Sequence, residues 1–358
     1  MRIAVLPGDD IGPEITEAAL SVLRAADKSF GLGLEFDVHE VGMASHRKTG
    51  TTLPDSAVKA TFDADGVLLG PGGMTAYPPL SEGGINIPGT IRKKLDLYAN
   101  LRPARSRNGL DRARPGLDCI LARENTEGFY ADRNMFLGSG EFMPTPDIAL
   151  AVRKITRQAS RRIAEKAFEL AQTRRKHVTV VGKRHVLQVS DGIFVEEAEA
   201  VARNYPDVTL REVDIDAMVA DIYTNPDRFD VILITNMFGD ILSNLAVALS
   251  GGLGLAAALN VGDTHAAANA GHGSAPDIAG KGIANPSGII LSTAMLLDWW
   301  GAKQGGEKFH VASKAIEQSM DALLTSGQRT GDLGGNLGTQ AFAKAIAENL
   351  REPVKAAS

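Results

Sequence analysis

Short apolar runs alternate with amphipathic segments along this chain, and that alternation limits the available folds more than any other feature. Three successive pairs in the middle of the chain show it: 177–183 before 192–204, 208–215 before 216–223, and 229–236 before 237–251. A short apolar run followed by a segment with helical spacing is typical of a strand–helix unit. Repeated units of this kind favour an α/β fold, with a largely parallel sheet and helices on its faces.

The same pattern extends toward both ends of the chain. The expected strands are Arg2–Leu6, 34–41 and 66–70, and the expected helices are a segment from Pro13, 91–98 and 156–172. Pro13 suits a first helical turn, where its missing N–H would have no partner anyway. Beyond residue 251 we expect a Gly/Ala-rich loop and then three helices.

Composition excludes several classes of protein. The chain has 358 residues, of which 44% are hydrophobic, so it can bury a large core, and its length suggests two domains. The net charge of −5 argues against nucleic-acid binding, because proteins that bind nucleic acids usually carry clustered basic residues. No apolar run reaches the length of a membrane span or resembles a signal sequence. Cys119 is the only cysteine, which excludes an internal disulfide, and we expect a cytoplasmic protein.

Three arginines on separate elements are candidate ligands for an acidic substrate. Arg92, Arg102 and Arg123 lie in RKKLDLY, ANLRP and RENTEG. Guanidinium groups bind carboxylates in bidentate fashion, so together they suit a small di- or tricarboxylate. Taken singly, each is more typical of a surface ion pair. Arg105, Arg107, Arg112 and Arg114 read as a solvated basic face.

Two further side chains are candidate proton carriers. Tyr130 closes RENTEGFY, and a tyrosine beside acids and arginines can donate a proton to an enolate. Lys183 ends an apolar strand, where desolvation can lower its pKa toward a base role. A buried structural tyrosine and an exposed strand-end lysine are the alternative interpretations.

Acidic and amide side chains follow two of the later strands. Asp240 and Asn244 are four residues apart and so share one helix face, and Asp216 begins another helix. Carboxylate oxygens suit Mg²⁺ or Mn²⁺. Asp216 is equally compatible with a helix N-cap.

The segment 271–286, GHGSAPDIAGKGIANP, is the most distinctive loop. Its small residues allow main-chain N–H groups to approach a ligand, and a long apolar helix starts at its end. Asp277 could accept hydrogen bonds from a ribose diol but would repel a 2′-phosphate, which favours NAD over NADP. An ordinary surface loop is the alternative.

Taken together and in this order, these motifs resemble the β-decarboxylating dehydrogenases, the family of isopropylmalate, isocitrate, homoisocitrate and tartrate dehydrogenases. The resemblance rests on LPGDDIGPE, LDLYANLRP, RENTEGFY, NMFGDILSN, GGLGL and HGSAPDIAGKGIANP. It implies two open α/β domains sharing a largely parallel sheet: 1–99 with 255–358 for the cofactor, and 100–254 for dimerisation and catalysis. An arm near 131–150 would lie at the interface of a homodimer.

The resemblance also implies a reaction, the oxidative decarboxylation of a hydroxy-dicarboxylate. Its substrate-binding residues would be Arg92, Arg102, Arg123 and Asn86. Its ligands for Mg²⁺ or Mn²⁺ would be Asp216, Asp240 and Asn244. Lys183 would take the hydroxyl proton and Tyr130 would protonate the enol, with Lys183 and Asp216 entering from the second subunit. The residues implied to bind NAD are His272, Gly273, Ser274, Ala275, Pro276, Asp277 and Asn285.

Four positions depart from the pattern of that family. They are Asp10, where glycine is usual; Asn244, where aspartate is usual; His185, where asparagine is usual; and Asn269, which starts Asn-Ala-Gly where Glu-Pro-Val is usual. The loop before Arg92 fits no member's substrate cleanly. The first expectation is a substituted malate like 3-isopropylmalate. Isocitrate, homoisocitrate, tartrate or malate, and a non-catalytic regulatory homologue, remain the alternatives.

Overall fold

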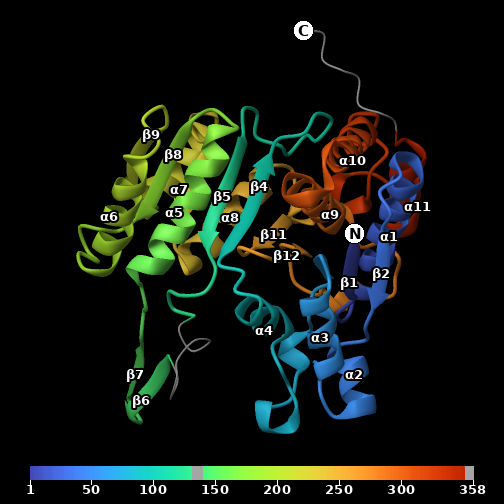
Figure 1. Ribbon diagram of the computed structural model, residues 1–358, viewed down its shortest axis with the longest axis horizontal. Helices are drawn as coiled ribbons and strands as arrows, with labels where there is room; N and C mark the ends of the chain where they lie inside the picture. Colours follow the sequence, from blue (N-terminus) through green and yellow to red (C-terminus); the bar gives the residue numbers. More distant parts are fainter. Residues whose placement is uncertain (131–139, 351–358) are drawn as a thin grey trace.

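A twisted sheet of ten strands runs through the molecule and is flanked by helices (Figure 1). The computed structural model describes residues 1–130 and 140–350. The strand order is β2-β1-β3-β12-β11-β4-β5-β10-β8-β9. The strands of this sheet are β1 Arg2–Leu6, β2 Glu35–Val38, β3 Gly66–Leu69, β4 Ala99–Arg105, β5 Asp118–Glu124, β8 His177–Gly182, β9 Thr209–Asp214, β10 Val231–Ile234, β11 Ala257–Val261 and β12 Ala266–Ala270.

The sheet is parallel at both ends and antiparallel at its centre. The pairs β12–β11, β11–β4 and β4–β5 are antiparallel, and the other pairs are parallel. This confirms the expected α/β class with a largely parallel sheet. The expected loop after residue 251 is wrong in part, because β11 and β12 lie there. The division into two domains stays a prediction.

Helices cover both faces of the sheet (Figure 1). The helices are α1 Gly12–Phe30, α2 Gly42–Thr49, α3 Asp55–Asp63, α4 Ile87–Lys94, α5 Arg157–Gln172, α6 Ser190–Ala202, α7 Ile215–Thr224, α8 Asn236–Leu249, α9 Ser287–Trp300, α10 Glu307–Thr325 and α11 Thr339–Glu348. Successive side chains of strand β5 point to opposite faces of the sheet and pack against different helices. Its Ile120 packs in one buried cluster with Phe168 of α5, and its Leu121 packs in another with Leu242 of α8.

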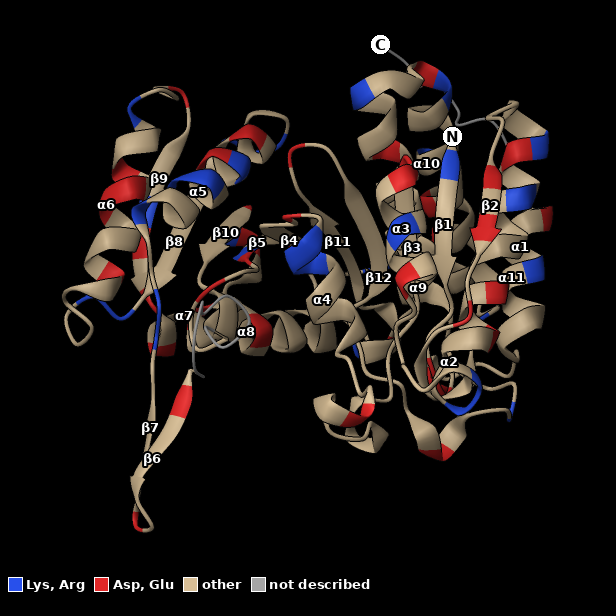
Figure 2. Ribbon diagram, turned by 60° about the horizontal axis from the view of Figure 1, so that its bottom comes forward, with Lys and Arg blue, Asp and Glu red and all other residues tan. Residues whose placement is uncertain are grey.

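Local sequence explains the best-defined helices. Thr156 caps α5 by accepting a hydrogen bond from Ala159 N, and buried Ile163, Ala167 and Ala171 recur at helical spacing behind it. Lys, Arg, Asp and Glu are interspersed on the outer faces of helices such as α5 and α6 (Figure 2). No helix in the described ranges is long and apolar enough to cross a membrane.

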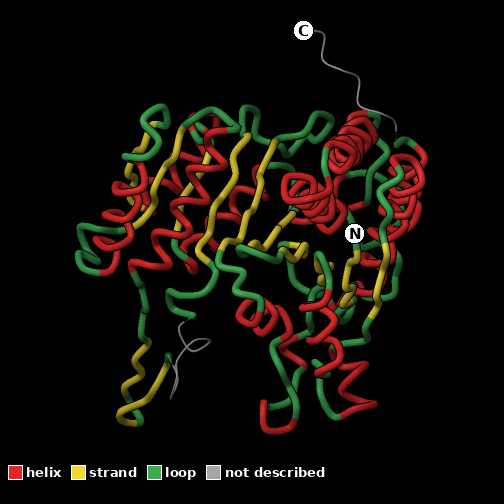
Figure 3. Tube along the Cα trace, viewed as in Figure 1, coloured by secondary structure: helices red, strands yellow, loops and turns green. Residues whose placement is uncertain are grey.

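A two-stranded ribbon projects from the body of the protein (Figures 1 and 3). Strands β6, Glu141–Thr145, and β7, Ile148–Ala151, pair with each other and with no strand of the main sheet. Its apolar side chains Phe142, Met143 and Leu150 are exposed to solvent. The expected arm over 131–150 therefore corresponds to a ribbon in its second half, and residues 131–139 lie outside the described residues.

Candidate active site

A cavity of about 310 Å³ gathers residues from distant parts of the chain. The loops after β3 and β12 form one side of this cavity. Helix α4 and the strands β4 and β5 form its other sides, and α8 contributes the carboxylate of Asp240. The lining residues are Pro71, Gly72, Met74, Asn86, Pro88, Gly89, Arg92, Arg102, Arg123, Tyr130, Asp240, Asn269, Ala270, Gly271, His272 and Gly273. All four residues expected to bind substrate are among them. We call this cavity the acid pocket.

Helix α4 presents Asn86 and Arg92 to the acid pocket. Asn86 caps the helix, with its side-chain oxygen accepting from Gly89 N at 2.9 Å. Ile87 and Ile91 are completely buried and hold the helix against the protein, which fixes the face that Arg92 presents.

Arg102 and Arg123 are buried side by side on the antiparallel strands β4 and β5. Their exposed fractions are 7% and 3%. Arg123 donates to Asp240 Oδ1 at 2.6 Å and to Asn236 Oδ1 at 2.6 Å. Arg102 donates to Ser243 Oγ at 2.7 Å and lies 3.1 Å from Asp240 Oδ1. Buried guanidinium groups need such partners, and the pair forms a fixed positive wall.

Asp240 is ionised in this setting. Its burial favours the neutral acid, but the nearby charges of Arg123, Arg102 and Arg92 outweigh this and hold the pKa of Asp240 below its usual range. Tyr130 donates to the other carboxylate oxygen, Oδ2, at 3.4 Å. The phenol thus points into the acid pocket beside the arginines.

Lys183 and Asp216 lie elsewhere in this chain. Lys183 follows β8, Asp216 is in the first turn of α7, and the two side chains form an ion pair with each other. That hydrogen bond raises the pKa of Lys183, so the expected lowering by desolvation is wrong for the single chain. Asp216 is also no N-cap, since α7 begins at Ile215 with Asp214 in the cap position.

A single chain does not assemble the expected metal ligands. Asp240 lines the acid pocket, Asn244 is one turn further along α8 and exposed, and Asp216 pairs with Lys183. No group of three or more His, Cys, Asp or Glu suited to a metal ion occurs in residues 1–130 and 140–350. The ionised carboxylate of Asp240 fits a hard divalent cation, but further oxygen ligands must come from outside this pocket.

A second cavity of about 770 Å³ adjoins the acid pocket through His272 and Gly273. Of the residues expected to bind NAD, His272, Gly273, Ala275 and Asn285 line it. Ser274, Pro276 and Asp277 belong to the same loop without lining the cavity, and Asp277 is exposed. Burial lowers the pKa of His272, which favours the neutral imidazole.

Sequence reasoning missed two residues of this second cavity. Asp332 lines it and accepts from Asn285 Nδ2 at 3.0 Å. A Cβ on Gly254 would lie 2.5 and 2.6 Å from these two side chains, so only glycine leaves room for the pair. Arg112, expected on a solvated face, also lines this cavity. The sequence motif Asp-Leu-Gly-Gly that begins at Asp332 was the signal that could have identified this residue.

Strained backbone occurs where the loops after β1 and β12 meet. Asp10 has φ of 54° and Ala275 has φ of 44°, both in the left-handed region. The conformation explains why glycine is usual at the position of Asp10; aspartate is among the residues that tolerate it. Ile11 N donates to Ser274 O at 3.1 Å, which ties the two loops together at the mouth of the second cavity.

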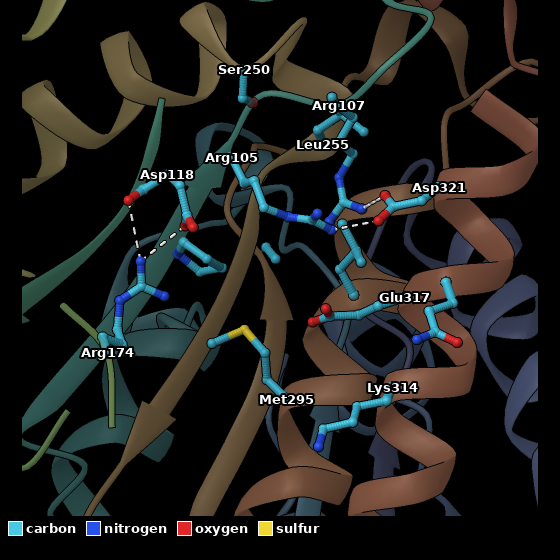
Figure 4. Close-up of a pocket in the computed structure, with 14 residues that line it drawn as sticks. Arg105, Arg107, Asp118, Arg174, Ser250, Leu255, Met295, Lys314, Glu317 and Asp321 are labelled. Atoms are coloured by element: carbon cyan, nitrogen blue, oxygen red, sulfur yellow. Dashed lines mark hydrogen bonds and ion pairs between the residues drawn. The ribbon is translucent and has the colours of Figure 1, made fainter. Parts of the chain in front are cut away.

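A third, charged cavity of about 500 Å³ shares no lining residue with the other two (Figure 4). Asp321 of α10 binds Arg105 at 2.6 Å and also Arg107. Arg107 has a nearly buried side chain, so the expected solvated basic face is wrong at this position. Glu317 faces the same cavity, and burial raises its pKa. Arg105 and Arg107 of this cavity therefore pair with the carboxylate of Asp321 on α10.

Comparison with known proteins gives consistent matches over the whole chain. A profile of the isocitrate/isopropylmalate dehydrogenase family matches residues 2–348. The isocitrate/homoisocitrate dehydrogenase of Thermus thermophilus is 41% identical, covering 98% of each chain. The 3-isopropylmalate dehydrogenase of Methanothermobacter thermautotrophicus is 42% identical, covering 98% of this chain and 99% of that protein. The crystal structure of isocitrate dehydrogenase from Methylococcus capsulatus superposes with a TM-score of 0.86 at 38% identity, covering 98% of this chain and 99% of that one.

Proposed function

Since this chain belongs to the isocitrate/isopropylmalate dehydrogenase family, we propose that it oxidatively decarboxylates a 3-substituted malate with NAD and Mg²⁺ or Mn²⁺. The products are a 2-oxo acid, CO2 and NADH. One observation carries the proposal: Arg92, Arg102 and Arg123 meet Tyr130 and Asp240 in the acid pocket. Buried guanidinium groups bind carboxylates, and the phenol is a proton donor beside them.

This chain's residues supply binding and proton transfer. The arginines hold the two carboxylates of the substrate, and Lys183 takes the proton of the C2 hydroxyl. NAD held in the second cavity by residues such as His272 and Asn285 would accept the hydride from C2. The bond from C3 to its carboxylate then breaks, CO2 leaves, and the electron pair forms an enolate. Tyr130 delivers a proton to C3. A divalent ion bound at Asp240 would lower the hydroxyl pKa and stabilise the negative charge.

We propose further that the active site is shared by two chains. Lys183 and Asp216 lie outside the acid pocket of their own chain, yet both are needed for this chemistry. Helix α7, which carries Asp216, also exposes Val219 and Tyr223, α8 exposes Ile241, and the ribbon β6–β7 exposes apolar side chains. Exposed apolar patches of this kind mark interfaces. A homodimer through these surfaces would bring Lys183 and Asp216 to the partner's pocket.

NAD is the proposed coenzyme because the second cavity carries a carboxylate. Asp332 lines that cavity and Asp277 lies in the adjoining loop, and either would repel a 2′-phosphate. Arg112, which also lines the cavity, can instead bind the diphosphate. A cytoplasmic location stays a prediction.

The direct test is NADH production from malate, tartrate, 3-isopropylmalate, isocitrate and homoisocitrate with Mn²⁺. We expect turnover of at least one substrate, dependence on the metal and preference for NAD over NADP. The matched control is Tyr130→Phe, which should lose turnover and retain NAD binding. A non-catalytic regulatory homologue would bind nucleotide but give no NADH with any substrate, and that result would reject the proposal.

A further inference from the structure

Three buried asparagines form a chain of hydrogen bonds that starts at Arg102 and ends at Asn269, and both of these residues line the acid pocket. Arg102 Nε donates to Asn100 Oδ1 at 2.7 Å, Asn100 Nδ2 donates to Asn260 Oδ1 at 2.8 Å, and Asn260 Nδ2 donates to Asn269 Oδ1 at 2.6 Å. Asn100 and Asn260 are completely buried, and Asn269 is 8% exposed. We call Asn100, Asn260 and Asn269 the amide relay.

Arg102 sets the direction of the amide relay. A guanidinium can only donate hydrogen bonds, so Asn100 must turn its oxygen toward Arg102 and its NH2 toward Asn260. Asn260 then presents its oxygen to Asn100 and its NH2 to Asn269. Each amide in turn fixes the next, because donor must meet acceptor at every step.

Main-chain carbonyls enforce the same direction independently. Asn260 Nδ2 also donates to Ala267 O at 3.2 Å. On its other side, Asn125 Nδ2 donates both to Leu97 O at 2.8 Å and to Asn260 Oδ1 at 3.1 Å. A carbonyl oxygen only accepts, so reversing Asn260 would set oxygen against oxygen at buried positions. The polarity of Asn260 is therefore fixed from two directions.

The amide relay ends as a hydrogen-bond donor in the acid pocket. Asn269 accepts from Asn260 with its oxygen, and its Nδ2 donates to Ala270 O at 2.7 Å. An NH2 group has two hydrogens, and among the described residues nothing else accepts from Asn269 Nδ2. Asn269 lines the acid pocket, so the second N–H is left for a molecule bound there.

Asn86 offers a second donor by the same reasoning. Its oxygen accepts from Gly89 N at 2.9 Å, so its NH2 points away from that bond. No group in the described part of the chain accepts from Asn86 Nδ2, and Asn86 lines the acid pocket too. The pocket thus combines three arginines with two amide donors, more than a plain dicarboxylate needs.

We infer that Asn269 is a specificity-determining residue whose free N–H binds an oxygen on the C3 substituent of the substrate. Asn100 and Asn260 act as positioning residues that hold this polarity. A carboxylate-bearing substituent satisfies the donor, whereas an alkyl substituent leaves it buried and unpaired. The inference rests on the proposed function and narrows it to substrates with a carboxylate on that substituent.

Two substitutions test the polarity. Asn269→Ala removes the pocket donor without adding a charge that would repel every acidic substrate. Asn260→Asp leaves the pocket wall untouched, but the new carboxylate cannot donate to Asn269 Oδ1, so the hydrogen bond that orients the Asn269 amide is lost. Asn204→Asp, an amide-to-acid change at an exposed position after α6, is the control.

The readout is kcat/KM for isocitrate, 3-isopropylmalate and malate. Loss of a hydrogen bond to a charged group predicts a roughly ten- to hundredfold fall for isocitrate in both relay variants, mainly through KM. The values for malate, and the KM of NAD, should change by less than about threefold. Equal losses on all substrates would indicate only structural damage and overturn the inference. A rise confined to the KM of NAD would assign the donor to the nicotinamide carboxamide and also overturn it.

A measurement of ligand binding separates this inference from the proposed function. Calorimetry with tricarballylate and with succinate needs no turnover. We expect Asn269→Ala to weaken tricarballylate by roughly tenfold or more and succinate far less. Equal weakening of both would reject the inference even if the wild-type protein oxidised no hydroxy acid. Asn269→Ala is the variant for this measurement because it adds no charge and leaves the buried residues Asn100 and Asn260 unchanged.

Discussion

Replacing Asp240 with asparagine separates the charge of this carboxylate from its shape. Asp240 Oδ1 lies 2.6 Å from Arg123 Nη1 and 3.1 Å from Arg102 Nη1, and both guanidinium groups are nearly buried. Removing one partner of a fully buried ion pair costs about 3–5 kcal/mol. Because 36% of the Asp240 side chain is exposed and the amide keeps one acceptor, we expect a loss of about 2 kcal/mol in the free energy of unfolding.

The chain provides a matched control for that substitution. Asp321 also binds two arginines, Arg105 and Arg107, and its side chain is 33% exposed. It lies on α10, in the charged cavity of Figure 4 and not in the acid pocket. Asp321→Asn should therefore destabilise the protein by a similar ~2 kcal/mol without changing the catalytic chemistry.

Urea unfolding gives the stability of each variant, and Mn²⁺ titration with NADH production gives its function. We expect Asp240→Asn to weaken Mn²⁺ by roughly tenfold or more, since it loses a carboxylate ligand. Asp321→Asn should keep its Mn²⁺ affinity and its kcat/KM within about twofold of wild type. Unchanged Mn²⁺ dependence in Asp240→Asn would refute the assignment of Asp240 to the metal. Equal functional loss in both variants would mean that destabilisation alone explains the effect.

Three other outcomes follow from the structure. Asp240 has a pKa below its usual range, so its stabilisation is present above about pH 4 and is lost as pH falls through the lower folded value. The difference in unfolding free energy between wild type and Asp240→Asn, measured by urea titration, should be constant from about pH 5 to 8 and shrink below about pH 4. Asp332→Asn should raise the Kd of NAD by roughly tenfold in a fluorescence titration; an unchanged Kd would remove Asp332 from the coenzyme site. Burial raises the pKa of Cys119 to about 12, so Ellman's reagent should label it only after unfolding, and rapid labelling of the folded protein would contradict its buried position.

The parts of the fold that the sequence predicted well are those with strong local patterns. The helix α5 has a Thr cap and apolar residues at helical spacing, β8 is rich in valine, and β10 is a continuous apolar run. The strands β11 and β12 were missed because alanine dominates both, and alanine has low strand propensity. Burial within the sheet, which sequence periodicity does not reveal, decides their conformation.

The acid pocket was predictable as a set of residues but not as a geometry. Three arginines on separate elements and a tyrosine beside acids suggested the chemistry, and the structure brings Arg92, Arg102 and Arg123 into one cavity. The ion pair between Lys183 and Asp216 depends on two strand ends that only the folded sheet brings together. The amide relay was also invisible, because isolated asparagines carry no pattern until β4, β11 and β12 are paired.

The most direct measurement of the shared active site is the activity of mixed dimers. Tyr130→Phe and Lys183→Ala should each give almost no NADH as separate proteins. After subunit exchange in an equal mixture, half of the dimers would carry both changes, each with one intact site, so activity should recover to about a quarter of wild type. Recovery to that level is the predicted result. A mixture that stays as inactive as its two components would contradict the account, because each chain would then have to complete its own site.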